Sequence, residues 1–270
     1  MAAGPLTAPR APALLLLYHG LGPARGAAAR FALPVARFQE HLAVIQQALR
    51  AGALASASLE AWWSGAAAPS VPTLLLCFDD GLVSDHRVAL PLLLAHGLQA
   101  TFFVNTAQIG LPGYLAWPQI RELRQAGMDI QSHGHEHTVL ARLASPALEA
   151  ALRTSRHILQ DRVGTPVHFL AAPYGLWNRR VREVALSCGF RALCVSRPGL
   201  AAAGRTVLPR NGVGAATSAP QLQDWLRCRH LDFLWRQGRN CLLWPPKQML
   251  WRCRPDWPAP APPLDWASMS

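Results

Sequence analysis

The sequence predicts an α/β protein built around a parallel sheet. Three observations carry this prediction: short apolar runs recur between residues 13 and 208, segments with helical spacing of apolar residues separate them, and polar residues directly follow several of the runs. With 270 residues, of which 51% are hydrophobic and 15% are charged, the chain can bury a sizeable core. Its length suits a single α/β barrel of about 250 residues as well as two smaller domains.

Seven short apolar runs are the predicted strands. Each is too short for a helix, and helical patterns lie between them, which indicates βα units and parallel pairing. The runs are Ala13 to Leu17, Thr73 to Phe78, Ala100 to Val104, Met128 to Gln131, Val167 to Ala171, Ala192 to Val195 and Thr206 to Leu208.

The predicted helices lie between these runs. From Val35 to Arg50, apolar residues recur at helical spacing, and the other segments carry start and stop signals such as Trp117-Pro118 at one end and glycine at the other. Further helices are expected from about His86 to His96, from Trp117 to before Gly127, from Ser145 through Leu159, and from Asn178 to Cys188.

Polar side chains follow the predicted strands at the end where parallel α/β folds place their active sites. One pocket is therefore expected to collect several of them. They are His19, Asp79, Asp80, Asn105, His133, Tyr174 and Arg210.

The adjacent carboxylates Asp79 and Asp80 end an apolar strand and precede Gly81. Neighbouring residues in a strand point to opposite faces, so both carboxylates reach one pocket only where the strand ends, and Gly81 permits the sharp turn this requires. A divalent cation bound by one of them would keep both ionised. This predicts Asp80 as a metal ligand and Asp79 as a base; the alternative is an exposed turn.

A histidine cluster follows the fourth predicted strand. His133 and His137 are four residues apart, close enough to share a cation in a tight loop or a helical turn. The alternative is that His133, His135 and His137 lie in a solvated loop or along an exposed strand. One of the three histidines is expected to be a spectator, and spacing alone does not identify it.

Three short motifs resemble those of the polysaccharide deacetylases, carbohydrate esterase family four. Residues 77–81 (CFDDG) resemble the family's T-F-D-D-G motif, residues 132–137 (SHGHEH) its H-(S/T)-x-x-H motif, and residues 169–175 (FLAAPYG) its R-x-P-Y-G motif. They occur in the family's order and at plausible separations. The combination is far more specific than any one of the motifs.

The resemblance implies a distorted (β/α)7 barrel over about residues 13–215 that removes N-acetyl groups from amino sugars. By position, Asp80, His133 and His137 would bind the metal, and Asp79 would be the general base. The backbone N–H of Tyr174 would stabilise the oxyanion. His135 has no ligand counterpart in the motif and would be the spectator.

Two departures from the family pattern concern the general acid and the base. Ala171 stands where many members carry an arginine that orients the catalytic aspartate, and no leucine-x-x-histidine motif follows Gly175. Leu16-Leu17-Tyr18-His19 fits that motif instead, and the chain resembles the poly-N-acetylglucosamine deacetylase subgroup, in which late motifs are permuted to the N-terminus. His19 is therefore the candidate acid, with a polar residue that merely closes a strand as the alternative.

The expected cofactor is a divalent metal, with Zn²⁺ as first choice and Co²⁺, Ni²⁺ or Fe²⁺ as alternatives. The expected partner is an acetylated amino sugar or oligosaccharide, contacted by Pro173, Tyr174, Asn105 and Arg210. A formal charge of +11 favours anionic partners, but the arginines are scattered, so nucleic acid is not expected. The rival functions are hydrolysis of another amide or ester and a carbohydrate-binding relative without full catalysis.

Residues 1–220 are expected to form the catalytic barrel, and residues 221–270, rich in Trp, Arg and Pro, a partly disordered appendage. The alternative for the appendage is a surface for a sugar chain or a membrane interface, with a scaffold or peripheral membrane role. No signal peptide or membrane-spanning run is evident, so a cytoplasmic location is expected.

Overall fold

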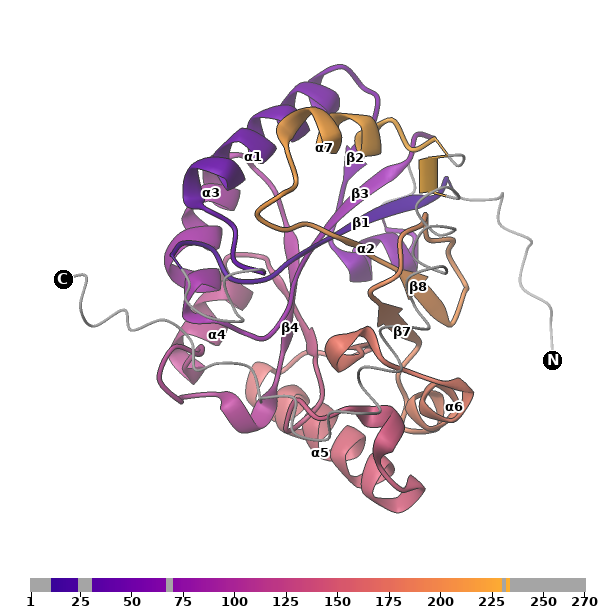
Figure 1. The fold of residues 1–270 in the computed structure, drawn as a ribbon. Coiled ribbons are helices and arrows are strands. Elements are labelled where there is room, and N and C mark those ends of the chain that lie inside the picture. The colour runs from indigo at the N-terminus through magenta and orange to yellow at the C-terminus, as the bar shows by residue number, and fades with distance from the viewer. Residues whose placement is uncertain (1–10, 24–30, 67–69, 230–231, 234–270) are drawn as a thin grey trace.

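The computed structural model describes residues 11–23, 31–66, 70–229 and 232–233. Figure 1 shows helices arranged around a ring of strands. In chain order the elements are β1 (Ala13–Tyr18), α1 (Val35–Arg50), β2 (Ala55–Ser56), α2 (Leu59–Ser64), β3 (Thr73–Phe78), α3 (Leu90–Ala95), β4 (Ala100–Val104), α4 (Trp117–Gln125), β5 (Asp129–Ser132), α5 (Ser145–Val163), β6 (Phe169–Ala171), α6 (Arg179–Ser187), β7 (Ala192–Val195), β8 (Val207–Pro209), β9 (Asn211–Gly212) and α7 (Ala219–Leu226).

The strands form one parallel sheet that nearly closes into a barrel. Their order is β8-β7-β6-β5-β4-β3-β1-β9, and β2 also pairs with β3. β8 pairs with β7 whereas β9 pairs with β1, and only Arg210 separates β8 from β9. This last extended segment therefore reaches both ends of the sheet. The predicted α/β barrel is confirmed.

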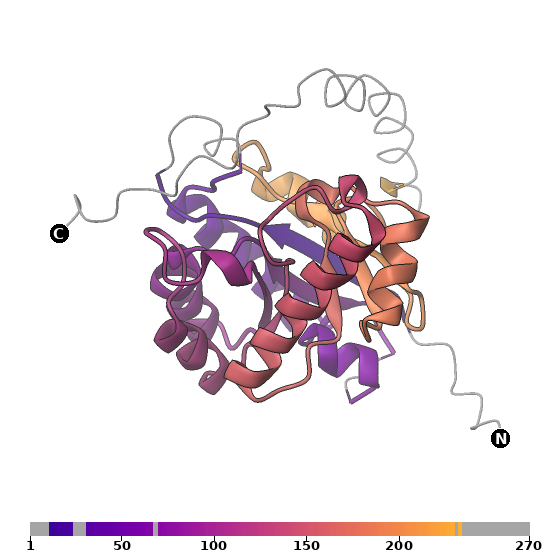
Figure 2. The ribbon, with the colours of Figure 1, turned by 90° about the horizontal axis from the view of Figure 1, so that it is seen from below.

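Alternation along the strands divides the apolar side chains into two layers. Leu15, Cys77 and Leu208 belong to an inner cluster that fills the barrel, which α2 joins through Trp62. The alternate positions, such as Leu16 and Phe78, pack outward against the helices. Figure 2, turned by 90°, shows α5 lying along the outside of the strands. Because both faces are covered, the strands read as continuous apolar runs.

All seven predicted strands and five predicted helical segments are present. The segment expected over residues 86–96 begins as a π-helical turn at Asp85–Ala89 and continues as α3. The short elements β2, α2 and β9 were not predicted, because two to six residues are too few to show a period. α7 was not predicted either, although Ser218 caps it by accepting a hydrogen bond from the Gln221 N–H.

The boundary expected at residue 220 falls inside α7. This helix packs against α1 and buries Leu222, Trp225 and Leu226. Residues 234–270, which make up most of the expected appendage, lie outside the described residues. Among the described helices, none combines the length and apolar character needed to cross a bilayer.

Candidate active site

The carboxyl ends of β1, β3, β5 and β6 bring the predicted site residues together. β1 and β3 pair in register with Tyr18 opposite Phe78, so His19 and Asp79 follow as neighbours. The Asp79 N–H donates to the Tyr18 carbonyl over 3.1 Å. On the other side, the His133 N–H donates to the Val104 carbonyl over 2.9 Å, which fixes the histidine segment against β4.

Asp80, His133 and His137 form a compact group of potential metal ligands. Asp80 Oδ1 lies 3.4 Å from His133 Nε2 and 3.2 Å from His137 Nε2, and one ligand atom from each residue lies within 4.8 Å of the others. Both histidines are buried. Two imidazoles and one carboxylate are ligands typical of a catalytic zinc site.

The hydrogen bonding of His133 supports this interpretation. Its Nδ1 lies 3.0 Å from the Ala171 carbonyl, which can only accept, so Nδ1 carries the hydrogen. In the neutral ring the Nε2 lone pair then faces Asp80 Oδ1. A lone pair and a carboxylate oxygen repel each other unless a cation lies between them, and a ring fixed by a backbone carbonyl is a usual outer-shell arrangement of metal-binding histidines. The donor set therefore fits a divalent metal.

Asp79 is held by Arg210. The two terminal nitrogens of Arg210 donate to Asp79 Oδ1 and Oδ2 over 2.6 and 2.8 Å, and both side chains are buried. The guanidinium also lies over the Phe103 ring, with Cζ 5.0 Å from the centroid. This two-pronged pair fixes the orientation of the carboxylate and supplies a full positive charge beside it.

This pair gives Arg210 a different position from the expected substrate contact and bears on a departure from the family pattern. Arg210 is fully buried, and both of its terminal nitrogens donate to Asp79. The methyl group of Ala171 cannot orient the base, because it offers no hydrogen-bond donor. Arg210, from the junction of β8 and β9, does so from another strand end.

The electrostatic environment keeps both aspartates ionised. Burial alone would raise the pKa of Asp79, but Arg210 and His133 outweigh this effect and lower it. Burial likewise opposes ionisation of Asp80, yet the adjacent imidazoles of His133 and His137 hold its pKa well below the usual range. Burial would lower the pKa of His133, and the charges of Asp79 and Asp80 raise it instead.

Strained backbone is concentrated at this site. Among the described residues other than glycine, only Asp80, His137, Tyr174 and Cys228 have a positive φ, and the first three belong to the site. The turn after Asp80 also needs Gly81, with φ of +67°, where a Cβ would lie 3.0 Å from a Val104 methyl group. Positive φ is unfavourable for such side chains and is often retained for function.

His19 lies at the same site, directly after β1. Burial lowers its pKa, whereas the neighbouring Asp80 and Asp79 act to raise it. Its ring packs against Phe31, with centroids 5.2 Å apart. Within the described part of the chain, its Nδ1 is buried without a hydrogen-bond partner.

The remaining expected site residues fall into different places. Tyr174 lies in the site, with its ring centroid 4.6 Å from that of His137, and Pro173 is buried at the start of the same turn. Asn105 is fully buried, so it offers no surface to a ligand and its expected substrate contact is not supported. His135, the expected spectator, is not part of the metal-ligand group among the described residues, and its Nδ1 lies 2.7 Å from the Thr106 hydroxyl.

Two site neighbours escaped the sequence reasoning. Tyr114 pairs with Leu82 just after the aspartates, and burial and then the charge of Asp80 raise its pKa to about 12. Asp85 is fully buried, and burial and then the charge of Asp80 raise its pKa well above the ordinary value. Neither residue belongs to a local pattern; only the fold brings Tyr114 back to the aspartates.

Comparison with known proteins gives a family match over the centre of the chain. The family model described as polysaccharide deacetylase matches residues 66–193. YxkH of Bacillus subtilis (strain 168), provisionally named a polysaccharide deacetylase, is 27% identical over 133 residues, which are 49% of this chain and 48% of that protein. The chain thus spans about half the length of this curated relative. His19 and Arg210 lie outside residues 66–193, so the family match does not include them.

Solved structures share the fold at low sequence identity. The Streptococcus pyogenes deacetylase PplD, in complex with acetate, has a TM-score of 0.72 and 22% identity over 80% of this chain and 98% of its own. IcaB from Ammonifex degensii has a TM-score of 0.71 and 21% identity over 80% of this chain and 97% of its own. These matches establish the barrel architecture of the polysaccharide deacetylase type.

Proposed function

We propose that this chain, which belongs to the polysaccharide deacetylase family, is a metal-dependent hydrolase that removes N-acetyl groups from an acetylated amino sugar or oligosaccharide. The observation that carries the proposal is the pairing of two devices at one end of the barrel. Asp80, His133 and His137 form a metal-ligand group, and Asp79 beside them is kept ionised and oriented by Arg210.

The chemistry is amide hydrolysis. A divalent cation held by the three ligands would polarise the acetyl carbonyl and lower the pKa of water beside it. Asp79 accepts the proton of the attacking water, for which its ionised carboxylate is prepared. The Tyr174 N–H donates to the carbonyl oxygen as negative charge develops there. His19 donates a proton to the departing nitrogen, and the products are acetate and a free amine.

Arg210 acts through Asp79. It holds the carboxylate in one orientation through two short hydrogen bonds, and its charge keeps a buried base ionised. A guanidinium beside Asp79 favours the unprotonated form that a base requires. Burial lowers the pKa of His19 although Asp80 and Asp79 oppose this effect, so His19 is proposed as the acid from its place beside the aspartates at the strand end.

Zinc is the metal we propose first, because it accepts imidazole and carboxylate ligands together. Cobalt, nickel and iron tolerate the same ligands. Metal content of the purified protein, measured by mass spectrometry before and after dialysis against chelator, identifies the ion. Restoration of activity by each metal in turn then distinguishes the ion that functions from the one that merely binds.

The decisive experiment is acetate release from oligomers of N-acetylglucosamine, with and without chelator. Asp79→Asn is expected to lower the rate by about 10² to 10⁴-fold, the usual contribution of a general base. His133→Ala is expected to abolish metal-dependent turnover. His135→Ala is the matched control, because it changes a histidine of the same segment that lies outside the ligand group.

Full activity in Asp79→Asn, or activity insensitive to prolonged chelation, would contradict the proposal. An O-acetylated sugar is included in the same assay. Turnover of this ester with no release from the N-acetyl substrates would assign the site to ester hydrolysis instead.

A further inference from the structure

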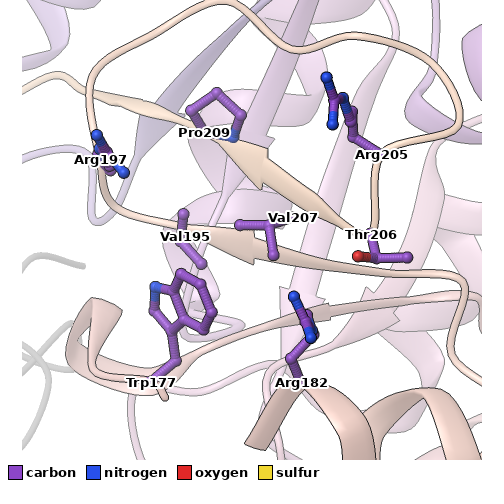
Figure 3. A pocket seen from close by; sticks show the side chains of 8 residues that line it. All are labelled: Trp177, Arg182, Val195, Arg197, Arg205, Thr206, Val207 and Pro209. Atoms are coloured by element: carbon purple, nitrogen blue, oxygen red, sulfur yellow. The ribbon is translucent and has the colours of Figure 1, made fainter. Parts of the chain in front are cut away.

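A second concave site lies beside the barrel rim, separate from the metal-ligand group. We call it the Arg–Trp pocket (Figure 3); its volume is about 440 Å³, within the range of small-molecule sites. It is lined by Trp177, Arg182, Val195, Arg197, Arg205, Thr206, Val207 and Pro209.

The pocket exists because of how β7 and β8 are connected. Elsewhere a helix usually covers the outer face between successive strands, but residues 196–206 link β7 to β8 without one. Val195 and Val207 belong to the outward-facing apolar layer, whereas their neighbours Cys194 and Leu208 face the barrel interior. The outer face of the last two strands is thus left as an apolar floor, which α6 and the linking loop surround.

The charged residues around this floor are almost all basic. Between residues 174 and 213 the only acidic residue is Glu183, while the arginines are Arg179, Arg180, Arg182, Arg191, Arg197, Arg205 and Arg210. Several of these are engaged elsewhere: Arg179 pairs with Glu183, Arg191 with Glu60 and Arg210 with Asp79. Three arginines, Arg182, Arg197 and Arg205, line the pocket, and no acidic residue does.

Arg182 and Arg205 are available to an anion. Arg182 approaches Glu183 only at 3.7 Å, and its Nε is buried without a partner among the described residues. Arg205 is exposed on the loop that leads into β8. In Figure 3 the Trp177 ring and the Arg182 side chain both extend toward the Val195 and Val207 floor. The site therefore combines an aromatic face with cationic donors, as a charged sugar ring requires.

The pocket and the candidate active site share their backbone supports. Trp177 lies three residues after Tyr174, and Pro209 directly precedes Arg210. The Arg210 N–H donates to the carbonyl of Val195 over 2.9 Å, and Val195 lines the pocket floor. A saccharide chain that extends over the rim from the metal-ligand group would meet the Arg–Trp pocket on the outer side.

We propose that the Arg–Trp pocket binds an anionic sugar unit, a uronate or phosphorylated residue, of the acetylated chain whose N-acetyl groups the active site removes. The sugar ring stacks on Trp177, and anionic groups of the chain bind Arg182 and Arg205, which lie on opposite sides of β8 in the view of Figure 3. This inference rests on the proposed function for the identity of the chain. It assigns the substrate to acidic glycans, in agreement with the formal charge of +11.

The test begins with binding, measured by titration calorimetry on the full chain in chelator so that no turnover contributes. The probes are a tetrasaccharide of alternating glucuronate and N-acetylglucosamine and, as the neutral control, a tetramer of N-acetylglucosamine. We expect tighter binding of the acidic probe, weakened by salt. Arg182→Gln/Arg205→Gln should weaken it on the order of 10-fold, since each lost contact is charge-assisted.

The matched control is Arg37→Gln/Arg153→Gln, which lowers the net charge equally by changing two helix-surface arginines paired with Glu40 and Glu149. Trp177→Leu is a second variant that removes the stacking face and keeps every charge. Equal binding of the acidic and neutral probes, or equal weakening by the two double variants, would overturn the proposal. Binding to phosphatidylglycerol vesicles without binding to the acidic probe would also overturn it, because it would identify a membrane surface.

Turnover separates this inference from the proposed function. With active metal-loaded protein, Arg182→Gln/Arg205→Gln should raise KM for the acidic substrate about 10-fold and leave KM for the neutral one unchanged. Arginine-dependent binding without acetate release from either probe would refute the deacetylase activity and retain the pocket. Release from both probes with no arginine dependence would retain the activity and refute the pocket.

Discussion

Replacement of Arg210 by methionine is the sharpest test of how the base is held. Methionine preserves much of the side-chain volume but removes the charge and both hydrogen bonds to Asp79. Because Asp79 and Arg210 are both buried, the substitution leaves a carboxylate without its partner in the interior. Breaking a buried ion pair on one side typically costs about 3–5 kcal/mol. We expect a loss of that size in the free energy of unfolding at pH 7.

The pH dependence of this loss has a definite sign. In the unaltered protein the pKa of Asp79 is lowered, so its contribution to stability is present above the unfolded pKa and is lost as pH falls through the folded value. Without Arg210 the burial effect dominates and raises the pKa of Asp79. The variant therefore gains stability relative to the parent as pH falls toward about 4, the unfolded value.

Urea unfolding with chelator present measures both effects without a contribution from metal binding. The Asp79→Asn/Arg210→Met double variant serves as the internal control, because it removes both charges. Its destabilisation should be well below the sum of the two single losses. The reasoning is refuted if the free energy of unfolding of Arg210→Met lies within about 1 kcal/mol of that of the parent. It is also refuted if the losses in the two single variants add up to the loss in the double variant, because the ion pair then does not support the base.

Three further predictions concern a buried acid, the metal ligands and a tight turn. Burial raises the pKa of Asp129 to about 6, so the folded state loses stability as pH rises from about 4 through 6. Asp129→Asn should therefore raise the free energy of unfolding at pH 8 by at most about 3 kcal/mol. If the pH dependence of the free energy of unfolding is the same in the variant and the parent, this prediction is contradicted. His137→Ala should abolish stoichiometric metal binding and the fall in Tm caused by chelator, whereas His135→Ala should retain both. Gly175→Ala should lower the free energy of unfolding, measured in urea, by about 1–3 kcal/mol, because the φ of Gly175 is +68° and a Cβ would lie 2.8 Å from Ser196 Cβ. Adding Ser196→Gly to this variant should recover only the part of the loss that is due to the contact.

Much of the barrel could be predicted from local patterns. Buried parallel strands are apolar on both faces, so runs such as Leu74 to Phe78 are visible without any alignment. The 16-residue helix from Val35 to Arg50 shows its period over several turns. β9 is different: Asn211–Gly212 contains no apolar run, and it is a strand only because β1 lies beside it in the closed barrel.

The site residues likewise include some that local sequence patterns predict and others whose role depends on the closed barrel. Asp79, Asp80, His133 and His137 belong to compact motifs, and the structure brings them together. Arg210 was found as a polar residue after a strand, but its role depends on a partner 131 positions earlier in the sequence. No spacing rule connects the two residues, because the connection exists only when the last strand segment closes the barrel. For the same reason Tyr114, brought to Leu82 by a loop, carried no signal.

The position of Arg210 links the closure of the barrel to the state of the base. The residues on its two sides pair with opposite ends of the sheet, Pro209 with β7 and Asn211 with β1, so Arg210 reaches Asp79 only from the junction. An arginine on β6, at the position of Ala171, would come from a strand connected to β3 through β5 and β4, so its contact with the base would not depend on the β8–β9 junction. In this chain, a loosened β8–β9 junction would move the Arg210 guanidinium away from Asp79 and thereby raise the pKa of the Asp79 carboxyl group. Changes that destabilise the β8–β9 junction are therefore expected to lower catalytic activity as well.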